Sequence, residues 1–165
     1  MRATCLFALL LAGPAAADLE VTFRDGAPKD RFSITNSGTC DLSAMSVLID
    51  LSSSPAGLIF DVTPQGQGVE VYQPLEVTSG AMFIDGISTV RDGDQWVQLD
   101  LSGLPAQAFV TVTTDLDDTI GAREITVSGA EIAGARVIIG TAYESTEAVF
   151  DETGVAIVRL PSCLS

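Results

Sequence analysis

The chain has 165 residues, of which 22 are acidic and 8 are basic, and its formal net charge at pH 7 is −14. A surface this acidic repels nucleic acids and anionic lipids, so we expect neither as a partner. The sequence contains no histidine, which excludes Ser-His-Asp and Cys-His catalysis as well as histidine-ligated zinc. The only lysine, Lys29, follows no glycine-rich phosphate loop. Most common enzyme mechanisms are therefore out of reach.

The first 17 residues have the pattern of a cleaved signal peptide. Arg2 supplies a positive charge, residues 6–12 form a short apolar run, and Ala15–Ala17 provide small side chains for cleavage before Asp18. The apolar run is too short to span a bilayer. We therefore expect a secreted or periplasmic protein without membrane insertion. Its mature part, residues 18–165, has 148 residues and should form a single domain.

Short runs of β-forming residues follow one another along the mature chain, separated by Gly, Asp, Asn, Pro and Ser. The runs lie at 19–23, 30–35, 45–51, 57–61, 69–77, 88–91, 95–101, 109–113, 124–127, 135–139 and 155–160. They predict about nine or ten short strands with regularly spaced turns, which is typical of an antiparallel, Ig-like β-sandwich. No window has a clear 3.6-residue period, and the glycines near residues 130–135 argue against a helix there.

Three of these runs carry more specific predictions. Residues 45–51 are rich in apolar side chains, which indicates a central strand. Pro74 places the run 69–77 at a sheet edge or at a bulge. Asp92-Gly93-Asp94 lies between two runs as a hairpin turn does, and turn chemistry explains its aspartates more simply than metal binding does.

Two cysteines remain after the predicted cleavage, because Cys5 leaves with the signal peptide. An even number of cysteines in an oxidising compartment favours a disulfide between Cys40 and Cys163, with two unpaired thiols as the alternative. The bridge would close a loop of 124 residues. Such a loop corresponds to about 4–5 kcal/mol on chain-entropy grounds. It would tie the C-terminal tail to the loop after the second strand.

The clearest sign of a specific chemistry is the acidic run Asp115-Leu116-Asp117-Asp118, which directly follows a predicted strand. Carboxylates this close repel one another unless water or a cation screens them. Calcium is the hard cation that binds carboxylate oxygens in secreted proteins. The run is not an EF-hand, because Ile120 and Thr126 stand where that loop needs Gly and Glu. It also has to bend, since extended geometry would separate its aspartates by about 7 Å. The predicted calcium ligands are Asp115, Asp117 and Asp118.

The remaining ligands would have to come from other loops, and the sequence does not choose among them. The candidates are Asp61, Glu70, Asp92, Asp94, Glu124 and Glu131, and we retain Asp61, Glu70 and Glu131 as the further ligands. The alternative is a solvated, aspartate-rich turn on a very acidic protein. Strong acidity is also common in proteins from salty habitats, so it need not indicate a metal.

Trp96 is the only tryptophan, and with Tyr72 and Phe83 it would offer a stacking platform to a sugar. A lone tryptophan in a strand of an all-β domain belongs more often to the core, and we expect that here. A pair of carboxylates acting as the acid and base of a glycosidase is a further alternative, but no feature of the sequence marks a buried acid.

Five segments of the mature chain carry a family resemblance. They are Phe60-Asp61, Gly68–Val71 with Gln73-Pro74, Val90–Asp94, Thr114–Thr119 and Ile125–Ala135. In these segments the chain resembles a group of small secreted bacterial proteins labelled "aggregation factor core"-like, and the Asp-Leu-Asp-Asp-Thr and Ser-Gly-Ala-Glu elements are the most distinctive. The resemblance implies a calcium-dependent role in cell adhesion or in an extracellular matrix. It implies no catalytic residue.

Together these observations predict a secreted, non-catalytic binding or adhesion module, stabilised by calcium, whose partner is an extracellular protein or a glycan. One alternative is a structural or carrier domain whose acidic surface reflects its habitat and which binds no metal. The other is a carbohydrate-binding or hydrolytic protein. The sequence does not determine the oligomeric state.

Overall fold

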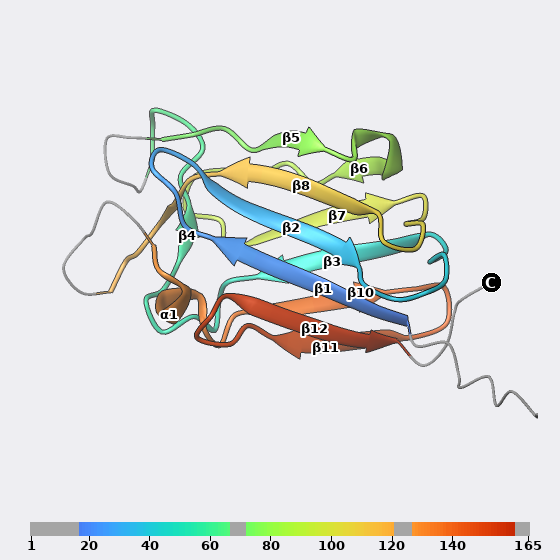
Figure 1. Cartoon of the computed structure of the whole chain (residues 1–165). Helices are drawn as coiled ribbons and strands as arrows, with labels where there is room; N and C mark the ends of the chain where they lie inside the picture. The colour runs from blue at the N-terminus through green and yellow to red at the C-terminus, as the bar shows by residue number, and fades with distance from the viewer. Residues whose placement is uncertain (1–16, 67–71, 121–126, 161–165) are drawn as a thin grey trace, which may run out of the picture.

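A computed structural model of the chain describes residues 17–66, 72–120 and 127–160. Within these residues, two five-stranded antiparallel sheets pack face to face (Figure 1). Their strand orders are β12-β1-β2-β8-β5 and β11-β10-β3-β7-β6. This arrangement confirms the prediction of an all-β sandwich.

The first sheet contains β1 (Ala17–Arg24), β2 (Asp30–Asn36), β5 (Glu76–Ser79), β8 (Phe109–Thr114) and β12 (Val155–Leu160). The second contains β3 (Met45–Asp50), β6 (Ile84–Ile87), β7 (Trp96–Leu101), β10 (Arg136–Gly140) and β11 (Ser145–Val149). A small third sheet pairs β4 (Ile59–Phe60) with β9 (Leu116–Asp117). Two single helical turns, η1 (Ala81–Phe83) and α1 (Gly129–Ile132), complete the described elements. The twelve strands among the described residues exceed the nine or ten that we expected.

The core lies between the two large sheets because apolar side chains alternate along their strands. Burial in β2 alternates from residue to residue, and its inward side chains include Phe32 and Ile34, both fully buried. The Phe32 ring lies 5.2 Å from the ring of Phe23 and 6.2 Å from that of Phe150, between centroids. Burying an aromatic ring of this size stabilises the fold by about 1.5–3 kcal/mol. The core therefore fixes the strands whose ends carry the polar groups described below.

The central position of β3 and the edge position of the strand after Pro74 are confirmed, and the predicted hairpin forms with a different first strand. β3 is the middle strand of its sheet, and β5, which follows Pro74, is an edge strand. A hairpin does join β6 to β7, but β6 ends at Ile87, so the predicted strand at 88–91 is wrong. The chain leaves the sheet after Ser88 because the turn at Asp92-Gly93-Asp94 forms its backbone hydrogen bonds with β4. The N–H of Gly93 donates to the Phe60 carbonyl (3.0 Å), and the Phe60 N–H donates to the Asp94 carbonyl (2.9 Å).

Sequence reasoning missed β11 and wrongly rejected a helical turn at α1. β11 is an edge strand without a buried residue, so its apolar alternation is weak. Gly129 does not break α1. A Cβ at this position would lie 2.8 Å from the Glu152 carbonyl oxygen, so the glycine permits close packing. A capping box between Ser128 and Glu131 starts the helix.

Several predictions fall on residues outside the described ranges. The signal peptide, the strand segments at 69–71 and 124–126, and Cys163 all do so, and they stay predictions. Among the residues that the structure does describe, no helix is long and apolar enough to cross a membrane.

Candidate metal centre

The pairing of β4 with β9 brings Asp61 next to the acidic run at one end of the sandwich (Figure 1). Ile59 lies opposite Asp117 in this small sheet. One residue beyond the pairing, the N–H of Asp61 donates to the carbonyl of Asp115 (3.1 Å). Two segments that are far apart in the sequence therefore present their aspartates to one another.

Asp61, Asp115 and Asp117 each place one carboxylate oxygen within 4.8 Å of the other two. The three side chains are only 3, 9 and 7% exposed, respectively. Asp61 Oδ2 is buried and has no hydrogen-bond partner. Burying a carboxylate oxygen without a donor is unfavourable, and a bound cation would remove that penalty. We call these three residues the acidic triad. No other such group of three forms within the described ranges.

The acidic run is buried, so the alternative of a solvated turn is wrong. Every residue from 111 to 118 is buried, and Asp118 is 5% exposed. The bend that the run requires occurs at Asp115, between the end of β8 and the start of β9. Asp118, although a predicted ligand, is not a member of the acidic triad.

A fourth aspartate, Asp30, holds the bend in place, and sequence reasoning missed it. Its Oδ2 accepts a hydrogen bond from the N–H of Leu116 (3.0 Å), and its Oδ1 accepts one from Gly26 (3.2 Å). The side chain is 2% exposed. Asp30 looked like the polar start of an alternating strand. Its position opposite Thr114 in the β2–β8 register could have revealed its proximity to the acidic run.

Burial and mutual repulsion raise the pKa values of these carboxyl groups. Burial is the main cause that raises the pKa of Asp115 to about 7, and the charges of Asp117, Asp30 and Asp61 add to it. Burial, then the charge of Asp117, raises the pKa of Asp61 to about 6. Burial also raises the pKa of Asp30 to about 7, although its two backbone donors partly oppose the rise. Above pH 7 the folded protein therefore confines several negative charges in a small, poorly hydrated volume.

Of the other candidate ligands, Glu131 bonds to a different part of the structure, and Glu70 and Glu124 lie outside the described ranges. Glu131 Oε2 accepts a hydrogen bond from the N–H of Ser128 at the start of α1, so Glu131 serves as a cap. Glu70 and Glu124 fall outside the described ranges, and nothing tests them as ligands.

Asp92 and Asp94 shape the turn before β7, as their sequence context predicted. Asp92 Oδ1 accepts hydrogen bonds from the N–H groups of Val62 and Thr63, both 2.8 Å, and Asp94 Oδ2 accepts one from Arg91 (2.8 Å). Burial alone would raise the pKa of Asp92, but the Thr63 hydroxyl and the two N–H donors bring it below its ordinary value. These carboxylates organise the loop that runs beside β4.

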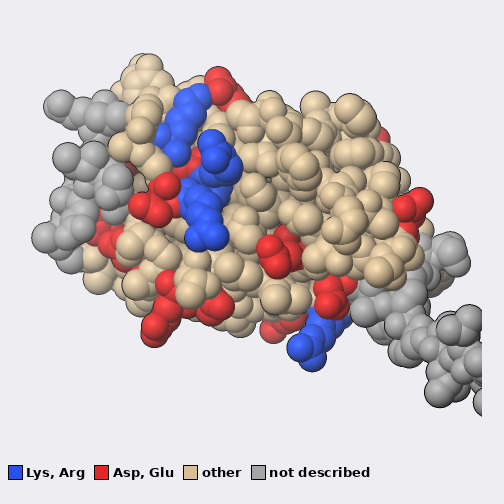
Figure 2. All heavy atoms as spheres, viewed as in Figure 1, with Lys and Arg blue, Asp and Glu red and all other residues tan. Residues whose placement is uncertain are grey.

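Within the described ranges, the ion pairs of the protein lie away from Asp61 and Asp115. Figure 2 shows basic side chains gathered on the outer face of the first sheet, toward the end that carries β4. Arg24 and Arg31 are cross-strand neighbours there, and Lys29 pairs with Glu76 at 2.5 Å. None of the ion pairs formed between described residues involves Asp61 or Asp115.

Trp96 is not a core residue, which corrects our expectation. Its side chain is 49% exposed on the outer face of β7. Tyr72 is 39% exposed, while Phe83 packs against the core near the other end of β7. A surface groove lies beside Trp96 between β3 and β7, and neither Tyr72 nor Phe83 lines it. The alternative, a platform formed by these three aromatic residues together, does not form either.

No protein-family model matches the chain, and no curated protein matches it with significance.

Proposed function

We propose that this protein is a secreted, non-catalytic binding module in which calcium stabilises one end of the β-sandwich. The observation that carries the proposal is the convergence of Asp61 with Asp115 and Asp117, one oxygen each within 4.8 Å. The buried Asp61 oxygen without a donor supports it further. A cation bound there would join β4 to β9 and would remove the repulsion among three buried carboxylates.

The chemistry of the acidic triad favours calcium over the other common metals. All of its donors are carboxylate oxygens, which hard cations prefer. Zinc sites need nitrogen or sulfur ligands, and the chain has no histidine. Calcium accepts six to eight oxygens in flexible geometry, so backbone carbonyls and water complete its shell, whereas magnesium demands a strict octahedron.

The geometry does not favour an enzyme. A carboxyl group with a raised pKa suits a general acid, and Asp61 and Asp115 have such values. Each member of the acidic triad is nevertheless less than a tenth exposed, which argues against direct contact with a substrate. A small ion fits this degree of burial, and a sugar or a peptide does not.

The predicted disulfide belongs to the same proposal, and the strand register of the first sheet is compatible with it. The Asn36 side chain donates to the Cys40 carbonyl (2.8 Å), which fixes this cysteine close to the end of β2. In the β1 register, Asn36 lies opposite Leu19 and Leu160 lies opposite Ala17. Both β2 and β12 therefore end at the same side of the first sheet, and Cys163 follows β12 closely.

Thermal unfolding with calcium and with chelator tests the metal proposal. Calcium that binds only the folded state should raise the free energy of unfolding by about 2.7 kcal/mol at a hundredfold excess over Kd, and the melting temperature should rise with it. Asp61→Asn should abolish this response. Asp85→Asn, at an exposed position in β6, is the matched control and should respond as the wild type does. A wild-type melting temperature that millimolar calcium leaves unchanged would rule out the site.

A further inference from the structure

A groove of about 570 Å³ lies on the outer face of the second sheet, where β3 and β7 run side by side. Its lining includes Leu48, Asp50, Asp94, Gln95, Trp96 and Gln98. This volume is in the range of ordinary small-ligand sites. The groove is separate from the acidic triad, none of whose members lines it.

Apolar and polar side chains alternate on the floor of the groove. In the β3–β7 register Trp96 lies opposite Asp50, and Leu48 lies opposite Gln98. Because these residues are two apart along each strand, all four side chains point to the same face of the sheet. The tryptophan and the leucine therefore occupy one diagonal, and the carboxylate and the amide occupy the other. Diagonal neighbours in a sheet lie about 7–8 Å apart.

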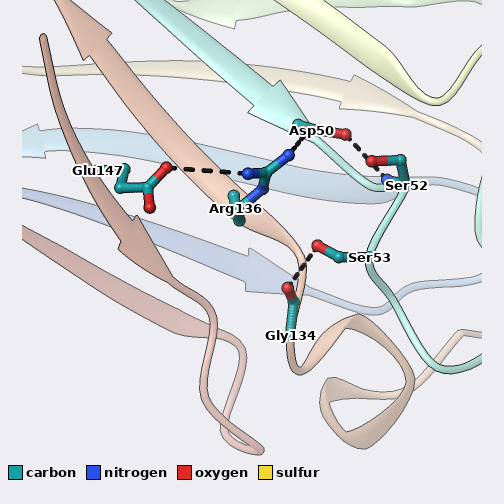
Figure 3. Close-up of polar contacts among 6 residues, drawn as sticks. All are labelled: Asp50, Ser52, Ser53, Gly134, Arg136 and Glu147. Carbon is teal, nitrogen blue, oxygen red and sulfur yellow. Dashed lines mark hydrogen bonds and ion pairs between the residues drawn. The ribbon is translucent and has the colours of Figure 1, made fainter.

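The walls of the groove are held by hydrogen bonds that do not depend on a ligand. The Asp94 carbonyl accepts the N–H of Phe60 (2.9 Å), and Gln95 Nε2 donates to the Leu58 carbonyl (3.1 Å). Figure 3 shows Asp50 held by Arg136, whose Nη2 lies 2.6 Å from Asp50 Oδ2. The N–H of Ser52 donates to the other oxygen of Asp50 (2.9 Å). A site formed in advance loses little conformational entropy on binding.

We infer that this groove binds a neutral saccharide, with one face of a sugar ring stacked on Trp96. This inference rests on the proposed role as a binding module and names its ligand class. A pyranose has an apolar C–H face and a rim of hydroxyl groups, which matches the mixed floor of the groove. Asp50 and Asp94 offer carboxylate oxygens that accept hydrogen bonds from hydroxyl groups, and Asp94, which unlike Asp50 has no ion pair with Arg136, repels uronic acids and sulfated sugars.

Two other occupants fit the groove less well. A protein partner would need a desolvated apolar pocket at the centre of the contact, and only Leu48 and Trp96 supply large apolar side chains here. A second copy of the chain would carry the same charge of −14 to a surface that already presents two carboxylates.

The single tryptophan makes the groove directly observable, because the intrinsic tryptophan fluorescence of the chain comes from Trp96 alone. We would titrate the calcium-supplemented protein with neutral gluco-, manno- and galacto-oligosaccharides and with an oligogalacturonate. Stacking of a sugar should shift the Trp96 emission to shorter wavelength with a saturable dependence on concentration. The oligogalacturonate should produce no such change.

Calorimetry on variants then assigns the binding to the groove. Trp96→Ala should weaken it at least tenfold, and Trp96→Phe, which keeps a ring, should weaken it less. Tyr143→Ala is the control, because Tyr143 is 92% exposed and does not line the groove. Far-ultraviolet circular dichroism establishes that each variant is folded.

Four results would overturn the inference. The first is a Trp96 emission that no neutral sugar changes, and the second is a Trp96→Ala variant that binds the sugar with the affinity of the wild type. The third is tighter binding of the oligogalacturonate than of the neutral sugars. The fourth is an emission shift that depends on protein concentration in the absence of sugar. The last result would indicate a second copy in the groove. Sugar binding by Asp61→Asn, which lacks the calcium response, would uphold the groove separately from the metal. A calcium response without any sugar binding would overturn the inference about the groove and leave the calcium proposal intact.

Discussion

Replacing Asp61 with asparagine should change stability in opposite directions with and without calcium. In the metal-free protein above pH 7, Asp61 is a buried charge beside Asp115 and Asp117. Asparagine has nearly the same shape, carries no charge, and supplies an amide that donates to a neighbouring carboxylate. The variant should therefore be more stable than the wild type in chelator. In calcium it should be less stable, because it has lost a ligand.

The structure sets the size of both effects. The pKa of Asp61 rises from 3.8 to about 6, and one pKa unit corresponds to about 1.4 kcal/mol, so charging this group in the folded protein costs about 3 kcal/mol at most. Screening by nearby water lowers this value, and we expect a gain of about 1–3 kcal/mol in chelator. At about 2–4 °C per kcal/mol, the variant should melt about 2–12 °C higher than the wild type. A thousandfold excess of calcium over Kd, which stabilises by about 4.1 kcal/mol, should raise only the wild type, by about 8–16 °C, and so place it above the variant.

Differential scanning calorimetry at pH 8 measures both effects with four samples, the two proteins each in chelator and in calcium. Asp85→Asn, run beside them, corrects for the general effect of removing one negative charge from a protein of net charge −14. An Asp61→Asn variant that is less stable than the wild type in chelator would show that the carboxylates do not repel one another in the folded state. The reasoning behind the acidic triad would then be refuted.

Four further predictions follow from other parts of the structure. In chelator, the free energy of unfolding measured with urea should fall as pH rises from 4 to 8. The raised pKa values of Asp30, Asp61 and Asp115 make the folded state bind more protons than the unfolded state in this range. A free energy of unfolding that rises with pH would contradict this prediction. Glu131→Gln should leave the calcium response intact, since Glu131 caps α1; a lost response in thermal melts would make it a ligand. Phe32→Ala should cost about 3–5 kcal/mol in urea unfolding, because its ring is fully buried against Phe23 and Phe150; a cost below 1 kcal/mol would contradict this packing. Thiol titration in denaturant should find Cys40 and Cys163 unreactive, and reduction should lower stability by about 4–5 kcal/mol; two reactive thiols would exclude the bridge.

The strands were predictable because their signal is local. Alternation along a strand reports which face is buried, and it located β1, β2, β3, β7, β8 and β12 to within a few residues. The same alternation, applied consistently, places Trp96 with Gln98 and Asp100 on the polar face of β7, opposite Val97 and Leu99. Our expectation of a buried Trp96 was wrong because a general tendency of tryptophan was preferred to this local pattern.

The acidic triad was predictable only in part, because Asp61 meets Asp115 and Asp117 through the pairing of β4 with β9, and the sequence contains little signal for that pairing. β4 and β9 have two residues each, too few to show a period, and the bonds of Phe60 to the turn at Gly93 and Asp94 position them from outside. Asp61 was consequently one of three further ligands retained from six candidates, and no pattern placed it ahead of Glu70 or Glu131. Asp30 was absent from them, since its role is to bind backbone N–H groups.

The position of the acids bears on why the protein carries them. Acidity that adapts a protein to salt acts through solvated carboxylates on the surface, where it supports solubility and hydration. Asp30, Asp61 and Asp115 are 2, 3 and 9% exposed, and burial raises the pKa of each. Such groups contribute nothing to a solvated surface and destabilise the folded state above neutral pH. Habitat therefore leaves the buried acids unexplained, whereas backbone N–H donors account for the burial of Asp30 and the proposed cation would account for the convergence of Asp61 and Asp115.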